Sequence, residues 1–316
     1  MTKSIGGYFE LECGNASPYH DNAVALNSAR NALRYVIRAY NIREIYAPIY
    51  TCPVVWDAIL AENCKIIPYD IDNSFMPIGD IPSDAFVLYN NYFGICGTNV
   101  MKMAKKYKNL ILDNAQAFYA PNCAMASIYS PRKFFGLPDG GLVLCDRRLE
   151  LDFETSVSYD LCSHLLKRID IGANGGYSDF QNNDEALIGR PIQKMSGLTH
   201  ALMGNIDYEF SRRRRQENFM TLHNSLGNDN QIKINLSSDD VPMVYPYRTS
   251  DNTLRNRLIE NKIFVARYWP PRGDGCMQSD AAQSMANTII PLPIDHRYDE
   301  NDMTRILSVI FGGANV

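Results

Sequence analysis

The residues best suited to chemistry in this sequence are an aspartate and a lysine near its middle. Asp113 ends the apolar run NLILD, and Lys133 follows the next strand-like run, in a loop that leads to Gly140 and Gly141. Because the carboxyl ends of parallel strands face one ligand crevice, we expect both side chains at the same site. A lysine forms a Schiff base with pyridoxal 5'-phosphate (PLP), and an aspartate keeps the pyridine nitrogen protonated. The pair therefore predicts a PLP site, where glycines let the backbone pass close to the ligand.

A second group of residues suits the phosphate of such a cofactor. Ser28, Ala29 and Arg30 begin the first predicted helix, and free N–H groups together with the helix dipole bind anions at such an end. Ser130 lies shortly before Lys133 and is placed to donate a further hydrogen bond. The same residues would also suit a plain helix cap with an exposed arginine, so this segment alone leaves both interpretations open.

The elements that must position these residues alternate between strand and helix. Helical spacing of apolar residues predicts helices over 26–40, 54–62 and 100–108. Short apolar runs predict strands within 43–50, 64–72, 84–92, 109–113, 124–130 and 141–146. This alternation predicts an α/β fold with a mostly parallel sheet covered by helices.

The second half of the chain has a different pattern. Residues 170–190 are rich in Gly, Asn and Asp without an apolar period, which predicts a surface loop or lid at a domain boundary. A long helix over 194–226, kinked at Gly204, is expected next. A small α+β unit should follow, with strands over 241–248 and 262–269 and helices near 251–261 and 300–311.

These patterns predict two domains. The first covers residues 1–190 and begins with an irregular arm over 1–25. The second covers 191–316 and holds the long helix and the small unit. Within the arm, Tyr19 and His20 would either reach a substrate or pack on the sheet, and the sequence leaves both open.

The composition is that of an ordinary globular protein. Of the 316 residues, 46% are hydrophobic and 21% charged, and the net charge is −4, which argues against a general nucleic-acid binder. No apolar run approaches the roughly 20 residues of a membrane span, and the beginning of the chain has no apolar signal-peptide core, so we expect a cytoplasmic protein. The eight cysteines have neither C-x-x-C nor zinc-type spacing, so we expect free thiols and no metal site.

Four blocks of this sequence resemble the DegT/StrS-type, PLP-dependent sugar aminotransferases of fold-type I. The residues 27–33, NSARNAL, lie where that family has its phosphate loop, Ser-Gly-Thr-x-Ala-Leu. The residues 47–51, APIYT, match Val-Pro-x-x-Thr, and 113–116, DNAQ, match Asp-x-Ala-Gln. The residues 133–141, KFFGLPDGG, match Lys-x-x-Gly-x-Gly-Glu-Gly-Gly. The third and fourth of these blocks, which hold Asp113 and Lys133, are specific to the family when they occur together, as they do here.

The resemblance implies a fold-type I α/β protein with a smaller C-terminal α+β domain, working as a homodimer. It implies that Lys133 holds PLP, that Asp113 pairs with the pyridine nitrogen, and that Gln116 contacts the hydroxyl side of the ring. Cys52 stands where the family has an aromatic residue that stacks on the ring, and Tyr50 or Tyr92 is the candidate to replace that aromatic.

The activity implied is transfer of an amino group from an amino acid, typically glutamate, to a keto-sugar carried on a nucleotide, for surface polysaccharide or other glycan synthesis. Lys133 would then act as the general base. Two alternatives remain open. One is another PLP reaction, such as a sugar dehydratase, although the family's dehydratases have His in place of the Lys. The other is a non-catalytic binding or regulatory module on the same fold.

Overall fold

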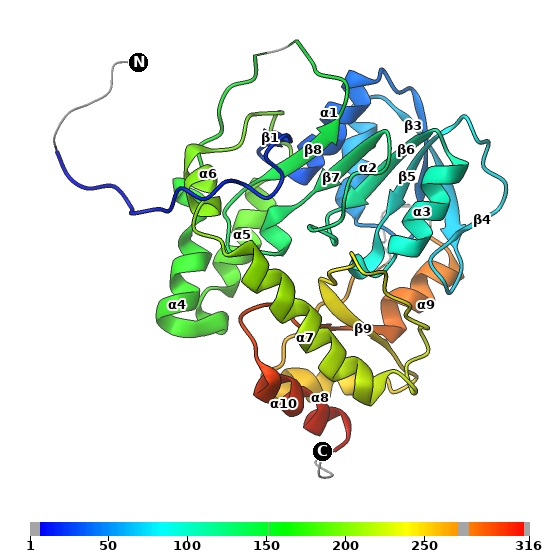
Figure 1. Cartoon of the computed structure of the whole chain (residues 1–316), viewed down its shortest axis with the longest axis vertical. Coiled ribbons are helices and arrows are strands. Elements are labelled where there is room, and N and C mark those ends of the chain that lie inside the picture. The colour runs from blue at the N-terminus through cyan, green and yellow to red at the C-terminus, as the bar shows by residue number, and fades with distance from the viewer. Residues whose placement is uncertain (1–6, 151, 271–277, 313–316) are drawn as a thin grey trace.

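The computed structural model describes residues 7–150, 152–270 and 278–312. An eight-stranded sheet is the larger of its two sheets (Figure 1). Its strands lie in the order β1-β8-β7-β6-β5-β2-β3-β4. They are β1 (Val24–Leu26), β2 (Glu44–Pro48), β3 (Lys65–Ile71), β4 (Pro77–Ile78), β5 (Phe86–Asn90), β6 (Asn109–Asn114), β7 (Ala126–Tyr129) and β8 (Gly141–Cys145). The strands from β3 through β2, β5 and β6 to β7 are parallel, and β1, β4 and β8 pair antiparallel. The predicted α/β fold with a mostly parallel sheet is therefore confirmed.

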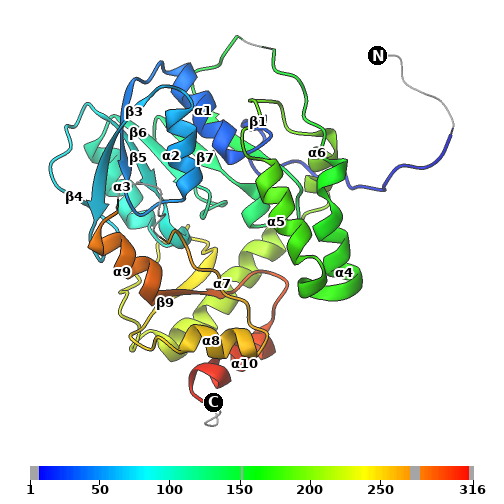
Figure 2. The same cartoon turned by 180° about the vertical axis from the view of Figure 1, so that it is seen from behind.

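Both faces of this sheet are buried. Along β6, Ile111 belongs to one core and Leu110 and Leu112 belong to the other, because successive side chains of a strand point to opposite faces. The covering helices are α1 (Ala29–Ala39), α2 (Pro53–Leu60), α3 (Gly97–Lys106) and α7 (Tyr208–Leu226). Helices α1 and α2 lie on the Ile111 face (Figure 2), and α3 and α7 lie on the other face (Figure 1).

Helix α1 begins where the sequence predicts its cap. The backbone N–H of Asn31 donates to the hydroxyl of Ser28 at 3.2 Å, which satisfies one of the N–H groups that a helix start leaves free. Leu33 and Val36 lie on the buried stripe of the helix. Burial of this stripe against β7 and β8 fixes the start of α1 beside the loop that follows β7.

The second part of the chain packs around a two-stranded antiparallel sheet of β9 (Val244–Arg248) and β10 (Ile289–Pro293). Its helices are α8 (Leu254–Glu260), α9 (Asp280–Thr288) and α10 (Glu300–Ile310). The core on the α7 face of the large sheet continues into this part without a break.

Residues 170–190 do not form the predicted loop. Most of them lie in two helices, α4 (Ser163–Gly175) and α5 (Tyr177–Ala186), which pack against each other, and a turn over 187–189 follows. Gly172, with φ of +80°, interrupts α4. Only His164 of α4 and Asn183 of α5 are buried, so these helices have no buried apolar stripe, and the sequence gives no core-facing period by which to find them.

Two other predicted elements differ from the structure. The predicted strand over 262–269 does not form; the positive φ angles of Lys262 and Trp269 break an extended chain at both ends, and β10 supplies the second strand instead. The long helix is divided into α6 (Gly197–Met203) and α7. A Cβ at Gly204 would lie 2.3 Å from the carbonyl oxygen of Gly14, so the N-terminal arm crosses the chain at the break.

Within the described ranges, none of the helices is both long and apolar enough to cross a membrane. The seven cysteines of those ranges are free thiols. Cys276 lies outside the described residues.

Candidate functional site

One cavity of about 170 Å³ opens beyond the carboxyl ends of the parallel strands. Seven of the predicted site residues line it: Ser28, Ala29, Arg30, Cys52, Asp113, Ser130 and Lys133. They come from the start of α1, the turn before α2, the end of β6 and the loop after β7. The fold thus brings together residues that the sequence spreads over more than a hundred positions, as expected for the switch region of a parallel sheet.

Asp113 lies at the end of β6 with its carboxylate turned to this cavity. Its Oδ1 accepts the backbone N–H of Ala115 at 2.8 Å, which fixes the orientation of the carboxylate. Burial raises the pKa of Asp113, and the positive charge of Lys133 and the Ala115 N–H oppose this rise. A cation placed beside Asp113, such as a protonated pyridine, would therefore favour its charged form.

Lys133 ends a short 3-10 turn, Pro131–Lys133, that directly follows β7. Its backbone N–H donates to the carbonyl of Ser130 at 3.1 Å. This turn brings Lys133 and Ser130 to the same cavity as Asp113, and Lys133 is the only lysine among its described lining residues.

The glycine pair after Lys133 packs against the start of α1. A Cβ at Gly141 would lie 2.2 Å from the carbonyl carbon of Ser28, and the N–H of Gly140 donates to the carbonyl of Asn27 at 3.0 Å. Gly140 has a φ of +121°, which an L side chain rarely adopts. The glycines therefore hold the lysine loop against the start of α1. The sequence predicts that they let the backbone approach a ligand, whereas the structure shows that they let it approach the backbone of Asn27 and Ser28.

Two arginines reach the cavity near the start of α1, and sequence reasoning found only one of them. Arg132 joins Arg30 in the lining, and both side chains are largely buried. Within the described residues, neither Nη1 of Arg30 nor Nε of Arg132 has a hydrogen-bond partner. Buried donors without partners are costly, so the pair fits an anion. The sequence offered one signal for Arg132, its position directly before Lys133. Side chains of a predicted loop are expected to be solvated, so this signal did not indicate a binding residue.

The donor set of the cavity fits PLP. The unpartnered arginine donors and the α1 start suit its phosphate, Asp113 suits its pyridine nitrogen, and Lys133 suits its aldehyde. Its walls include Cys52, Ala115 and a group of aliphatic side chains: Leu33, Val54, Val55, Leu88, Ile128 and Leu187. Among the described residues no aromatic side chain lines it, so its aliphatic side chains are the candidates to contact the faces of the cofactor ring.

Tyr50 and Gln116 are not among the lining residues. Tyr50 is fully buried and packs on Trp269, with ring centroids 4.8 Å apart, so the expectation that it replaces the stacking aromatic is not met. Tyr92 stacks on Tyr50 and is likewise buried away from the cavity. Oε1 of Gln116 accepts the backbone N–H of Phe93 at 2.8 Å, and its Nε2 is buried without a partner in the described part of the chain.

The N-terminal arm packs on the sheet. The ring centroids of His20 and Tyr129 lie 4.1 Å apart, and Nε2 of His20 lies 2.6 Å from the carbonyl oxygen of Phe118. Tyr19 packs edge-on against Tyr119. Of the two interpretations that the sequence left open for Tyr19 and His20, the structure shows packing.

Three solved structures are similar to this chain over most of its length. A DegT DnrJ EryC1 StrS aminotransferase from Brucella abortus matches 92% of this chain and 85% of its own, with a TM-score of 0.61 and 14% identity. NtdA from Bacillus subtilis with bound cofactor PMP matches 92% and 73%, with a TM-score of 0.65 and 17% identity. Helicobacter pylori PseC, an aminotransferase involved in the biosynthesis of pseudoaminic acid, matches 92% and 86%, with a TM-score of 0.59 and 14% identity. The chain has the fold of the DegT/DnrJ/EryC1/StrS-type aminotransferases.

No protein-family profile and no curated protein sequence matches the chain. The fold that the four short sequence blocks imply is confirmed by the three similar structures. In this aminotransferase fold, Asp113 and Lys133 stand at the ends of neighbouring parallel strands, and α1 begins beside them. At 14–17% identity the fold alone is shared, so the chemistry must be argued from this chain's own residues.

Proposed function

We propose that this protein is a PLP-dependent aminotransferase that moves an amino group from an amino acid to a keto-sugar. The observation that carries the proposal is the single cavity that holds Lys133, Asp113 and the unpartnered donors of Arg30 and Arg132. As the sequence resemblance implies, we propose glutamate as the donor and a nucleotide-linked keto-sugar as the acceptor, for surface polysaccharide or other glycan synthesis. The free cysteines of the described ranges support a reducing compartment, the cytoplasm.

We propose a separate role for each polar residue of the cavity. Bound PLP would act as the electron sink for the bond-breaking at the amino acid. Lys133 would hold the cofactor covalently through Nζ and, once released, accept the α-proton of the donor at that atom. Asp113 would hold a proton on the pyridine nitrogen, and Ser28, Ser130 and Arg30 would bind the phosphate. The aliphatic walls would contact the faces of the pyridine ring.

Lys133 also bears on the choice between PLP reactions. Transamination needs a base that takes a proton from one carbon and returns it to another on one face of the ring, and a lysine freed from the cofactor lies at that place. Among the described residues no histidine lines the cavity. We therefore favour amino transfer over the elimination of a sugar dehydratase.

The test of the function is the first half of the reaction, which does not require knowledge of the sugar. We expect glutamate to convert the yellow PLP form of the purified protein to the colourless PMP form, with an equal amount of 2-oxoglutarate released. Absorbance and keto-acid assays measure both products. If a panel of amino acids including glutamate and glutamine leaves the spectrum of PLP-loaded protein unchanged, the aminotransferase proposal fails and a binding module becomes the better interpretation.

We further propose that the protein is a homodimer, with α4 and α5 in the interface. These helices lie side by side at the edge of the molecule (Figures 1 and 2). They and the turn after them leave large apolar side chains exposed, with Ile169 at 81%. The others are Leu166, Ile171, Tyr177, Phe180 and Ile188. Such a patch beside the cavity suits a second copy of the chain, and closed two-fold dimers are the commonest oligomers.

Light scattering tests the dimer. Wild-type protein should be a dimer at micromolar concentration, and Ile169→Glu should shift it toward monomer because a charge is buried in the interface. Ile259→Glu, at an exposed apolar residue of α8, is the matched control and should remain dimeric. Wild-type protein that is monomeric at micromolar concentration would refute this proposal.

A further inference from the structure

A carboxylate stands at the rim of the cavity, between its two arginines. Oδ1 of Asp184, on α5, lies 3.5 Å from Nη2 of Arg30 and 3.5 Å from Nη1 of Arg132. All three residues line the cavity together with Ser28. One carboxylate is therefore paired with two guanidinium groups. Each guanidinium group still has a buried nitrogen, Nη1 of Arg30 and Nε of Arg132, without a partner among the described residues.

The geometry makes the ion pairs of Asp184 with Arg30 and Arg132 weak. The distances lie at the long limit of a charged hydrogen bond. The side chain of Asp184 is 54% exposed, whereas those of Arg30 and Arg132 are only 17% and 15% exposed, so water competes more for the carboxylate than for the guanidinium groups. Burial lowers the pKa of Arg132, Asp184 raises it, and the charge of Arg30 lowers it further. Two buried like charges thus remain only partly neutralised.

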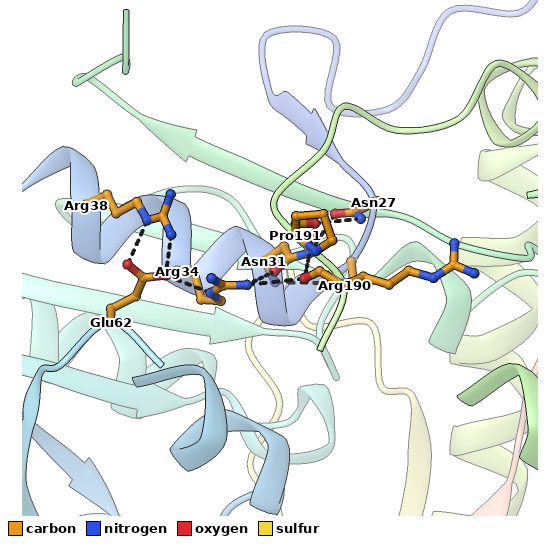
Figure 3. A network of polar contacts seen from close by, with 8 residues as sticks. Asn27, Asn31, Arg34, Arg38, Glu62, Arg190 and Pro191 are labelled. Carbon is orange, nitrogen blue, oxygen red and sulfur yellow. Dashed lines mark hydrogen bonds and ion pairs between the residues drawn. The ribbon is translucent and has the colours of Figure 1, made fainter. Parts of the chain in front are cut away.

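The chain is anchored at Asn183 and at Pro191, on both sides of Asp184. Beside it, the Nδ2 of buried Asn183 donates to the carbonyl of Pro138 at 3.1 Å, in the loop after Lys133. After α5, the carbonyl of Pro191 accepts Nδ2 of Asn31 at 2.7 Å. Figure 3 shows this contact within a network that joins α1 to residues 190 and 191, in which Arg34 also bonds to the carbonyl of Arg190 at 3.2 Å.

Glu62 completes the anchor on the α1 side of this network (Figure 3). Its Oε1 accepts Nε of Arg34 at 2.7 Å, and its Oε2 accepts Nε of Arg38 at the same distance. Arg34 is thereby oriented toward the chain that follows α5. The end of α5 is thus tied to the helix whose first residues border the cavity.

We propose that Arg30, Arg132 and the start of α1 form a site for a phosphomonoester dianion, and that Asp184 is its built-in counter-ion, which the dianion displaces. The inference rests on the proposed function, where that phosphate is the one carried by PLP. A dianion has three oxygens that accept hydrogen bonds and can reach donors that Asp184 leaves unpartnered. Because Asp184 carries charge of the same sign as the phosphate, it sets how tightly the phosphate is held.

Arg132 should increase the affinity for phosphate, and Asp184 should decrease it. We would titrate inorganic phosphate by calorimetry into full-length protein that has been freed of cofactor by hydroxylamine treatment and dialysis. Arg132→Gln should weaken phosphate binding about 10-fold or more, the scale of a lost charge-assisted hydrogen bond. Asp184→Asn should strengthen it by about 2- to 5-fold, the scale of a half-exposed ion pair. Glu185→Gln, an exposed neighbour on α5, loses the same charge and should leave the affinity unchanged.

Unchanged affinity in Arg132→Gln would overturn the phosphate site, and unchanged or lower affinity in Asp184→Asn would overturn the counter-ion. If Arg132→Gln does not fold, Arg132→Lys serves instead, because it keeps the charge but loses the planar fork, and it should still weaken binding. Phosphate binding does not involve Lys133 chemistry. Failure of PLP to attach to Lys133 with the phosphate effects intact would therefore refute the proposed function alone, whereas attached PLP without these effects would refute this inference alone.

Discussion

Lys133→Ala should abolish covalent attachment of PLP and lower turnover by at least about 10³-fold, within the range that a positioned general base contributes. The physical reason is that Lys133 is the only lysine among the described residues lining the cavity, so no other amine there can bind the aldehyde or take the α-proton. Borohydride reduction followed by peptide mapping should place the pyridoxyl group on Lys133 in the wild-type protein and nowhere in the variant.

Two further variants separate the roles of this lysine. Lys133→Arg keeps a positive charge beside Asp113 but cannot attach PLP, so it should be as inactive as the alanine variant if the covalent bond matters. Lys105→Ala removes an exposed lysine of α3 and should leave labelling and turnover unchanged. A pyridoxyl label on another lysine of the wild-type protein, or none with PLP in excess, would disprove the assignment.

Asp113, Lys133 and Ser28 could be placed from the sequence because each stands at the end of a regular element. An apolar run that ends in an acid marks the end of a strand, and a serine before an amphipathic run marks the start of a helix. The topology of a parallel sheet then brings these ends together. Local sequence was therefore sufficient to predict that these three residues share one cavity.

The directions of Tyr50 and Gln116 could not be predicted in the same way. Tyr50 packs on Trp269, and Gln116 holds the backbone of Phe93. Both contacts join segments that are far apart in the sequence, and Phe93 has a φ of +57° that no local pattern reveals. A motif fixes the order of residues, whereas the packing of distant segments decides which cavity a side chain enters.

Asp184 and Arg132 were missed for a related reason. Asp184 lies on α5, which buries only Asn183 and therefore gives no helical period to find in the sequence. Arg132 lies in a 3-10 turn, where the side-chain direction follows from the turn geometry. The anion-binding part of the site thus depends on contacts between α1, the lysine loop and α5 that only the folded chain displays.

Asp113→Asn should lower turnover by at least about 10²-fold, the scale of removing a preorganised electrostatic partner. An amide has no negative charge to keep the pyridine nitrogen protonated, so the cofactor would lose its capacity to accept electrons. The amide oxygen can still accept the Ala115 N–H that Oδ1 of Asp113 now accepts. Steady-state kinetics measures the loss, and Asp84→Asn, at an exposed turn before β5, is the matched control with no expected effect.

Stability provides the readout that separates chemistry from folding in this variant. Burial raises the pKa of Asp113 in the cofactor-free protein, so the fold disfavours the charged carboxylate relative to the unfolded chain. This cost is present at pH values above the raised pKa and disappears as the pH falls below the ordinary value of about 3.9. At neutral pH the neutral amide should therefore leave the Tm of cofactor-free protein unchanged or higher. Near-wild-type turnover in Asp113→Asn, or a loss of turnover that matches a lower Tm, would mean that Asp113 is only a strand-end cap.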